Sequence, residues 1–235
     1  QTDDIFGFSH GIVLSTGNIK DIEGPNKAYN TTTNNQLPGD WDLEYFFFEN
    51  TRMSTYDASS LSFDFVCDGV AELKFEYVFA SEEYNEYVGS TYNDVFAFFL
   101  NGENVAILPN KDDTRINSIH CGNDNPLDTT LPIPPSPNCN LFIDNEDGHV
   151  YTEMDGLTQV LMAEGKSRDG PNTIKLVIAD VADGKFDSAV ILKSGSFNCI
   201  ADSEAPSLAP TSQPSGTPTA VPTGVPSLAP TSQPS

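Results

Sequence analysis

Proline occupies every fourth position from residue 206 to residue 234, and this period excludes a packed core at the end of the chain. Each of these prolines is followed by serine or threonine. Proline holds φ near the polyproline II value and removes a backbone donor, so we expect an extended left-handed rod with a solvated backbone. We therefore expect residues 205–235 to be a stalk that follows a separate domain over residues 1–204.

Regularly spaced hydroxyls among prolines and small residues are typical of segments that carry dense O-linked sugar. The candidate hydroxyls belong to Ser207, Thr211, Ser215, Thr219, Thr223, Ser227, Thr231 and Ser235. A second route, hydroxylation and glycosylation of the prolines, would use Pro206, Pro210, Pro214, Pro218, Pro222, Pro226, Pro230 and Pro234. The strict period argues against the remaining interpretation, an undecorated flexible linker. The decapeptide PSLAPTSQPS occurs at 206–215 and again at 226–235, so we expect the natural protein to continue.

Residues 1–204 show repeated strand patterns. LSFDFVC (61–67) and ELKFEYVFA (72–80) alternate apolar and polar residues, whereas DVFAFFL (94–100) and TIKLVIAD (173–180) are nearly continuous apolar runs. The first pattern is typical of half-buried strands and the second of more deeply buried ones. AVILKSGSF (189–197) predicts a further strand. We expect an all-β domain, an antiparallel β-sandwich with a jelly-roll-like topology.

Helical periodicity is nearly absent from the domain. The only segment that we expect to be able to wind is SEEYNEYV (81–88), and it is short. Turn dipeptides such as Asn101-Gly102 and Asp183-Gly184 separate the predicted strands instead.

The formal charge of the chain is −23, from 34 acidic and 11 basic residues. A surface of this charge repels phosphate backbones and anionic lipids, so nucleic acid is not an expected partner. The longest apolar runs are too short to be inserted in a membrane. The chain starts at Gln1 without an apolar leader, as expected of a mature secreted protein that is extracellular or at the cell surface.

The four cysteines form an even set, which in a secreted chain favours disulfides. Zinc is disfavoured because no CxxC spacing is present. Of the three connectivities, we favour Cys121 with Cys139 and Cys67 with Cys199; the first would close a proline-rich loop. A sequon at Asn30-Thr31-Thr32 predicts an exposed loop and a site of N-glycosylation.

Several segments together resemble the choice-of-anchor L domain of secreted and surface-attached proteins. They are GIVLSTGNIKDIEGPN (11–26), FEYVFASEEYNEYVGSTYNDVFAFFLNG (75–102), AILP (106–109), DGLTQVLMA (155–163) and IKLVIADVADGKFDSAVILKSGSF (174–197). The resemblance implies an extracellular β-rich module joined to an anchoring tail, and membership of that family implies no particular catalytic activity. The Pro-Ser/Thr tail departs from bacterial sorting tails and resembles the repeats of secreted algal wall-type glycoproteins.

The same segments concentrate carboxylates near the ends of the predicted strands. They are Glu82, Glu83 and Glu86, Asn93 and Asp94, and Asp180, Asp183 and Asp187. Oxygen ligands gathered from adjoining loops are what Ca²⁺ prefers, so we expect Glu82, Glu83, Asn93, Asp94, Asp180, Asp183 and Asp187 to hold calcium. The alternative is that these side chains cap loops by accepting hydrogen bonds from backbone N–H groups. No EF-hand pattern is present to strengthen the calcium interpretation.

Catalytic motifs are missing from the sequence. The three histidines, His10, His120 and His149, form no HExxH motif, and GxSxG is absent. A retaining glycosidase needs a close pair of carboxyls, such as Glu83 with Asp94 or Asp187, but such pairs are common in so acidic a chain. We expect a protein that is not an enzyme.

Two functions are therefore expected. The first is a structural glycoprotein whose copies assemble into a surface fibre or matrix, because exposed strand edges accept further strands. The second is a calcium-dependent adhesion or carbohydrate-binding module on a glycosylated stalk, with aromatic residues such as Trp41 and Tyr92 against glycan. Trp41 is equally expected in the core.

Overall fold

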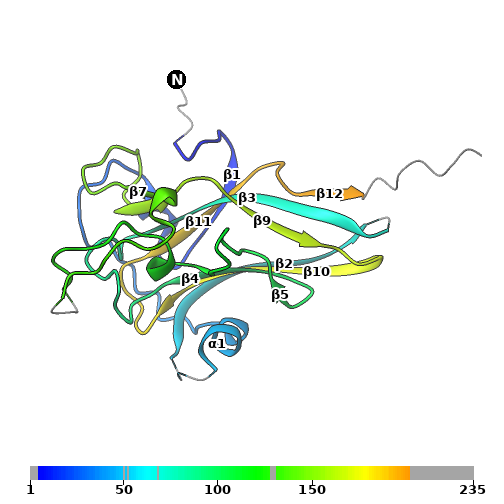
Figure 1. Ribbon diagram of the computed structural model, residues 1–235, viewed down its shortest axis with the longest axis horizontal. Helices are drawn as coiled ribbons and strands as arrows, with labels where there is room; N and C mark the ends of the chain where they lie inside the picture. The colour runs from blue at the N-terminus through cyan, green and yellow to red at the C-terminus, as the bar shows by residue number, and fades with distance from the viewer. Residues whose placement is uncertain (1–4, 50, 52, 68, 128–130, 202–235) are drawn as a thin grey trace, which may run out of the picture. The chain divides into compact units, whose positions relative to one another are not determined.

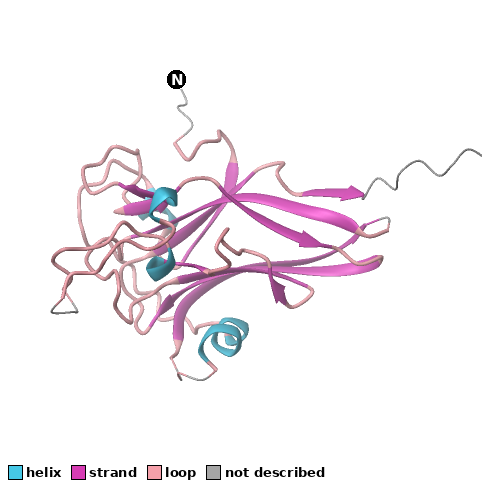
Figure 2. Cartoon of the chain, in the orientation of Figure 1, coloured by secondary structure: helices cyan, strands magenta, loops and turns pink. Residues whose placement is uncertain are grey.

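The structure is a computed structural model that describes residues 5–49, 51, 53–67, 69–127 and 131–201, with the backbone alone at 198–201. Two antiparallel β-sheets face each other, as Figures 1 and 2 show. This arrangement confirms the predicted all-β antiparallel sandwich. The tail at 205–235 lies outside the described residues, so its predicted rod and its candidate glycosylation residues stay predictions.

The first sheet has the strand order β1-β11-β3-β8-β7, and β9 and β12 also pair with β3. Its strands are β1 (Gly11–Ser15), β3 (Ala71–Ser81), β7 (Phe142–Asp144), β8 (Gly156–Thr158), β9 (Leu161–Lys166), β11 (Ser188–Lys193) and β12 (Asn198–Ala201).

The second sheet has the order β2-β10-β4-β5, and β6 pairs with β4. Its strands are β2 (Thr55–Cys67), β4 (Val95–Leu100), β5 (Glu103–Asn104), β6 (Thr114–Arg115) and β10 (Gly170–Val181). The helical elements are α1 (Trp41–Phe48) and the 3₁₀ turns η1 (Ile19–Ile22), η2 (Ile116–Ser118) and η3 (Cys139–Leu141).

The main core lies between the two sheets. Phe75, Tyr77 and Phe79 of β3 point into it from one side, because successive side chains of a strand alternate between faces. Phe96 and Phe98 of β4 meet them from the other sheet, and the rings of Phe75 and Phe98 lie 5.6 Å apart.

The outer face of the second sheet is also covered. Figure 1 shows α1 beside the sheet of β2, β4 and β10, on the side away from β3 and β9. Leu43 and Phe48 of α1 pack against the alternate residues of β4, which are Val95, Ala97 and Phe99. Both faces of β4 are therefore buried, which explains why the sequence VFAFFL shows no polar alternation.

The segment that we expected to be able to wind does not form a helix, and a helix forms elsewhere. Residues 82–88 form turns with a single α-type bond, from the Tyr87 amide to the Glu83 carbonyl. Helix α1 instead begins after Asp40, whose carboxylate accepts the amides of Asp42 and Leu43. Its run of aromatic residues hides a helical period in the sequence, and packing against the second sheet holds the helix in place.

Candidate functional site

Carboxylates from four segments meet at one end of the sandwich. Glu82 and Glu83 follow β3, and Asp187 precedes β11; Ser81 of β3 pairs with Ser188 of β11. Asp94 precedes β4 and Asp180 lies near the end of β10, where Val95 pairs with Ala179. Antiparallel register therefore brings the start of one strand beside the end of the next, and the predicted acidic residues with them.

These carboxylates are buried. Glu82, Glu83, Asp94, Asp180 and Asp187 are each at most 1% exposed. The ion pairs formed among the described residues involve other carboxylates, such as Asp40 with Lys175. Buried charges are normally paired or bound to metal, so this cluster is unusual for a protein interior.

Glu83, Asp94 and Asp180 form the group that we call the Glu83 cluster. Asp94 is well bonded, because its Oδ1 accepts the Val181 amide at 2.9 Å and its Oδ2 accepts the Ser188 hydroxyl at 2.6 Å. Both oxygens of Asp180 and Oε2 of Glu83 have no hydrogen-bond partner within the described structure. The register of β2 against β10 shifts between Ile178 and Asp180, an irregularity of the kind that redirects side chains.

The electrostatics of the Glu83 cluster oppose ionisation of its carboxyls. Burial, and then the charge of Asp94, raise the pKa of Asp180 and the pKa of Glu83. The nearby Thr16 hydroxyl, which donates its hydrogen bond to the Ser188 carbonyl, lowers the pKa of Asp180 in part. Burial raises the pKa of Asp94, although the hydrogen bonds from the Ser188 hydroxyl and the Val181 amide lower it. The hydroxyl of buried Tyr84 also lacks a hydrogen-bond partner among the described residues, and burial and then Asp94 raise its pKa.

Glu82, Glu153 and Asp155 form a second group, the Glu82 cluster. Glu82 Oε2 accepts the Thr31 amide at 3.2 Å, and Asp155 Oδ1 accepts the Asn26 side-chain amide at 2.7 Å. Burial, and then the charge of Asp155, raise the pKa of Glu82 to about 10, and burial raises the pKa of Asp155 to about 7. Glu153 and Asp155 were not identified from the sequence as members of an acidic cluster. The one feature of the sequence that could have indicated them is their position just before β8.

The other predicted metal ligands accept hydrogen bonds from loop backbone. Asn93 Oδ1 accepts the Asn117 amide at 2.8 Å, and Asp183 Oδ1 accepts the Lys185 amide at 3.2 Å. Both oxygens of Asp187 lie 2.9 Å from the Thr33 amide. Among the described residues, no group of three or more His, Cys, Asp or Glu side chains is arranged to hold a metal ion. The loop-capping interpretation therefore describes Asn93, Asp183 and Asp187 well.

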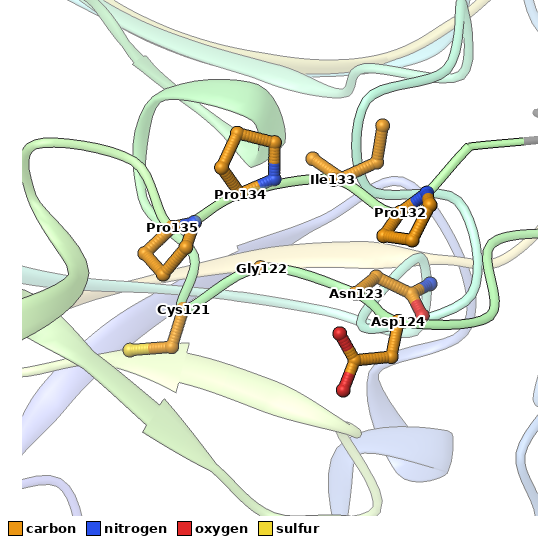
Figure 3. Close-up of a pocket in the computed structure, with 8 residues that line it drawn as sticks. All are labelled: Cys121, Gly122, Asn123, Asp124, Pro132, Ile133, Pro134 and Pro135. Carbon is orange, nitrogen blue, oxygen red and sulfur yellow. The ribbon is translucent and has the colours of Figure 1, made fainter.

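A disulfide joins Cys121 and Cys139, whose Cα atoms are 4.5 Å apart. Cys67 is also disulfide-bonded, and the side chain of its predicted partner, Cys199, lies outside the described residues. The Cys121 loop contains a pocket of about 350 Å³, which Figure 3 shows between the segments Cys121–Asp124 and Pro132–Pro135. Among the described residues that line it, Asp124 is the one ionisable side chain.

Aromatic side chains gather on the exposed side of α1. Trp41 is 70% exposed, not in the core, and its ring stacks on Tyr45 with centroids 5.1 Å apart. A pocket of about 270 Å³ lies beside Tyr45 and Phe46, and its polar lining includes Asp42 and Lys175. Tyr92, the second aromatic candidate, is half-buried and its ring packs edge-on against Tyr87.

The remaining candidates lie apart from the carboxylates. Asn30 is exposed in a turn. His10 and His149 are exposed, whereas buried His120 accepts the Gly122 amide through Nδ1 at 3.1 Å. Burial lowers the pKa of His120, which favours its neutral form.

The choice-of-anchor L domain family matches residues 1–198, and the chain belongs to this family. Membership places it among surface-associated or secreted proteins. The part of the chain that the structure describes contains no helix with the length and hydrophobicity of a membrane span.

Among solved structures, the chain is similar to a family 35 carbohydrate binding module from an environmental isolate, at 12% identity and a TM-score of 0.25. That match covers 77% of this chain and 96% of the other. A second similar structure is CBM35 from Cellvibrio japonicus Abf62, also at 12% identity and a TM-score of 0.25, with 80% and 97% covered. No protein with a curated description matches the sequence.

Proposed function

We propose that this protein is a non-catalytic structural subunit of an extracellular fibre or matrix, and that its copies join through the free edge of β2. Membership of a surface-associated family supports an extracellular role. The observation that carries the proposal is the outer edge of β2, which is long and nearly unprotected.

Strand β2 has 13 residues and stands at the end of its sheet. Its inner edge pairs with β10 along most of its length. On the outer edge, the amides of Asp57 and Ala58 bind the segment at Leu37 and Pro38. From Ser59 to Val66, no other strand of the described structure pairs with that edge.

Proteins usually protect such an edge with prolines, lysines, bulges or a covering segment. The stretch Ser59–Cys67 contains no proline or lysine, and Asp64 is its only charged residue. Its outward side chains are otherwise Ser60, Ser62 and Val66, the last 68% exposed. An edge of this kind accepts a strand from a second copy through backbone hydrogen bonds, which supports assembly.

Lysines on the edge test this function. In the variant Ser60→Lys/Ser62→Lys, both new side chains are exposed, so folding is retained while two charges oppose a second strand. We expect the full chain to form higher oligomers as its concentration rises, and the variant to stay monomeric. Light scattering coupled to size-exclusion chromatography measures this, and negative-stain electron microscopy shows whether the oligomers are filaments.

The control variant Thr91→Lys/Ser194→Lys adds the same charge at exposed positions on other segments. It should assemble as the unmodified chain does. A protein that is monomeric at all concentrations, or edge variants that assemble as well as the control, would show that β2 is not the assembly surface.

A second candidate function, glycan binding, is favoured by the stacked rings of Trp41 and Tyr45. Sites for such ligands combine aromatic walls with a few convergent polar groups, and the pocket beside α1 offers both. The variant Tyr45→Ala should then lose glycan binding in a glycan array, whereas Tyr151→Ala, which removes another exposed tyrosine, should retain it. Equal binding by both variants excludes the α1 pocket.

We also propose that the tail carries sugar, because its hydroxyls recur with every proline. Glycopeptide mass spectrometry of the secreted protein should find sugar on residues 206–235 and distinguish Ser/Thr from hydroxyproline attachment. The same digest reports whether Asn30 is occupied. An unmodified tail peptide would contradict the proposal and indicate an undecorated linker.

A further inference from the structure

Several buried oxygens in and beside the Glu83 cluster accept no hydrogen bond from the described residues. Both carboxylate oxygens of Asp180, one oxygen of Glu83 and the hydroxyl of Tyr84 have no partner within the described residues. Each of these three residues is at most 1% exposed. A buried polar group without a partner destabilises a fold substantially, and a carboxylate does so more than an amide.

No cationic side chain of the described residues forms an ion pair with this group. Ion pairs among the described residues engage Lys74, Arg115, His149, Lys175, Lys185 and Lys193, and their acidic partners lie outside the Glu83 cluster. The charges that act on Asp180 are those of other carboxylates, Asp94, Asp187 and Asp57. Like charges at a buried site repel strongly unless a cation or a proton separates them.

We infer that the carboxylates of Glu83 and Asp180 bind one calcium ion beside Asp94, at the loop end of the sandwich. The inference is independent of assembly through β2. The donors are carboxylates, with a nearby phenol hydroxyl, and the cluster contains neither His nor Cys, so a hard cation with oxygen ligands fits and zinc or copper does not.

The arrangement of the donors bears on which hard cation binds. No group of three or more His, Cys, Asp or Glu side chains of the described residues is arranged to hold a metal ion, so backbone carbonyls and water must supply the ligands beyond Glu83 and Asp180. Calcium accepts such irregular sets of six to eight oxygens, whereas magnesium demands a near-ideal octahedron. Calcium is therefore the expected ion.

Protonation is the competing explanation for the same geometry. A neutral Asp180 carboxyl beside an ionised Asp94 would also relieve the repulsion. The variant Asp180→Asn distinguishes calcium binding from protonation, because the amide has the size and neutrality of the protonated acid but is a weaker calcium ligand. A proton-sharing cluster predicts that the melting temperature of the unmodified protein is the same in calcium and in chelator, and this result overturns the proposal.

The first experiment measures thermal unfolding of the full chain, after chelator dialysis, with and without calcium. Calcium at about one hundred times its Kd should raise the melting temperature by about 5–10 °C. Magnesium at the same concentration should raise it less. In Asp180→Asn the calcium-dependent rise should be lost or at least halved.

Native mass spectrometry provides the second readout, because it counts bound ions directly. The Asp180→Asn variant should carry one calcium ion fewer than the unmodified protein, whatever the total. The control Asp147→Asn removes an exposed carboxylate, 89% exposed in its side chain, and should keep the full number. If Asp180→Asn does not fold, Glu83→Gln takes its place. Equal calcium counts in the cluster variant and the control overturn the assignment.

Discussion

Asp155 shows how burial acts on a single carboxylate of this protein. It is 1% exposed, and only one of its oxygens has a hydrogen-bond partner in the described structure, the side-chain amide of Asn26. Burial raises the pKa of Asp155 to about 7. The folded chain therefore keeps a proton that the unfolded chain releases at a much lower pH.

The pH dependence of stability follows from this shift. Between about pH 4 and pH 7 the folded state binds more protons at Asp155 than the unfolded state, so the free energy of unfolding decreases as pH rises. The variant Asp155→Asn keeps an oxygen for Asn26 but cannot ionise. In chelator at pH 8 it should be more stable than the unmodified protein by about 1–3 kcal/mol, and near pH 4 the difference should vanish.

Urea unfolding at several pH values measures this difference. The exposed substitution Asp147→Asn should leave the pH dependence unchanged. A variant Asp155→Asn whose stability falls with pH as steeply as that of the unmodified protein would contradict a buried, protonated Asp155.

Helix α1 shows the same dependence on context at the level of an element. Eight residues are too few for a stable helix in isolation, so α1 depends on its cap and on the sheet beneath it. Asp40 provides two interactions at once: it caps the first turn and pairs with Lys175 of β10 at 2.7 Å. Leu43 and Phe48 then close the outer face of the second sheet.

Removal of the cap should loosen this element. Asp40→Ala should lower the free energy of unfolding by about 1–2 kcal/mol, because two amides and one lysine lose their acceptor. Asp42→Ala, which removes the more exposed partner of Lys175, should have a smaller effect. Thermal unfolding followed by the fluorescence of Trp41, the single tryptophan, measures both variants. Equal losses in the two variants would show that Asp40 contributes only its charge.

At the scale of the whole molecule, net charge opposes the proposed assembly. A formal charge of −23 makes copies of the chain repel one another. The repulsion reaches about 30 Å at 0.01 M salt and about 8 Å at 0.15 M. A contact between two β2 edges is therefore more favourable when salt screens the surfaces.

Assembly should accordingly depend on ionic strength. Raising sodium chloride from 10 to 150 mM should lower the protein concentration needed for oligomers by about tenfold. Light scattering at a series of concentrations measures this, with Ser60→Lys/Ser62→Lys as the variant that should remain monomeric in both. Assembly that weakens as salt rises would indicate an interface held by ion pairs rather than by a strand edge.

Much of the architecture was predictable because the strands are indicated by local patterns of apolar and polar residues. The alternation of ELKFEYVFA placed Phe75, Tyr77 and Phe79 on one face, and the structure buries all three in the main core. The apolar run of β4 indicated a deeply buried strand, and its six residues are buried. The sequence favoured a bond between Cys121 and Cys139, and the structure contains it.

The candidate site was predictable only in part. The polar residues near the strand ends were visible in the sequence, but their spacing did not distinguish Glu83 and Asp180, which have buried oxygens without a partner in the described structure, from the residues that accept backbone amides, which are Asn93, Asp94, Asp183 and Asp187. That difference depends on where each side chain points after the strands pair, and hydrogen-bond partners come from loops distant in sequence.

The sequence by itself determined the β-rich class, the positions of the main strands and the separate character of the proline-rich tail, because each depends on a short repeating pattern. Only the tertiary structure decided that residues 41–48 form a helix, that β2 has a free edge and that Asp155 lies in the same buried cluster as Glu82. These features arise from packing and register between segments far apart in the chain, and no local pattern records them.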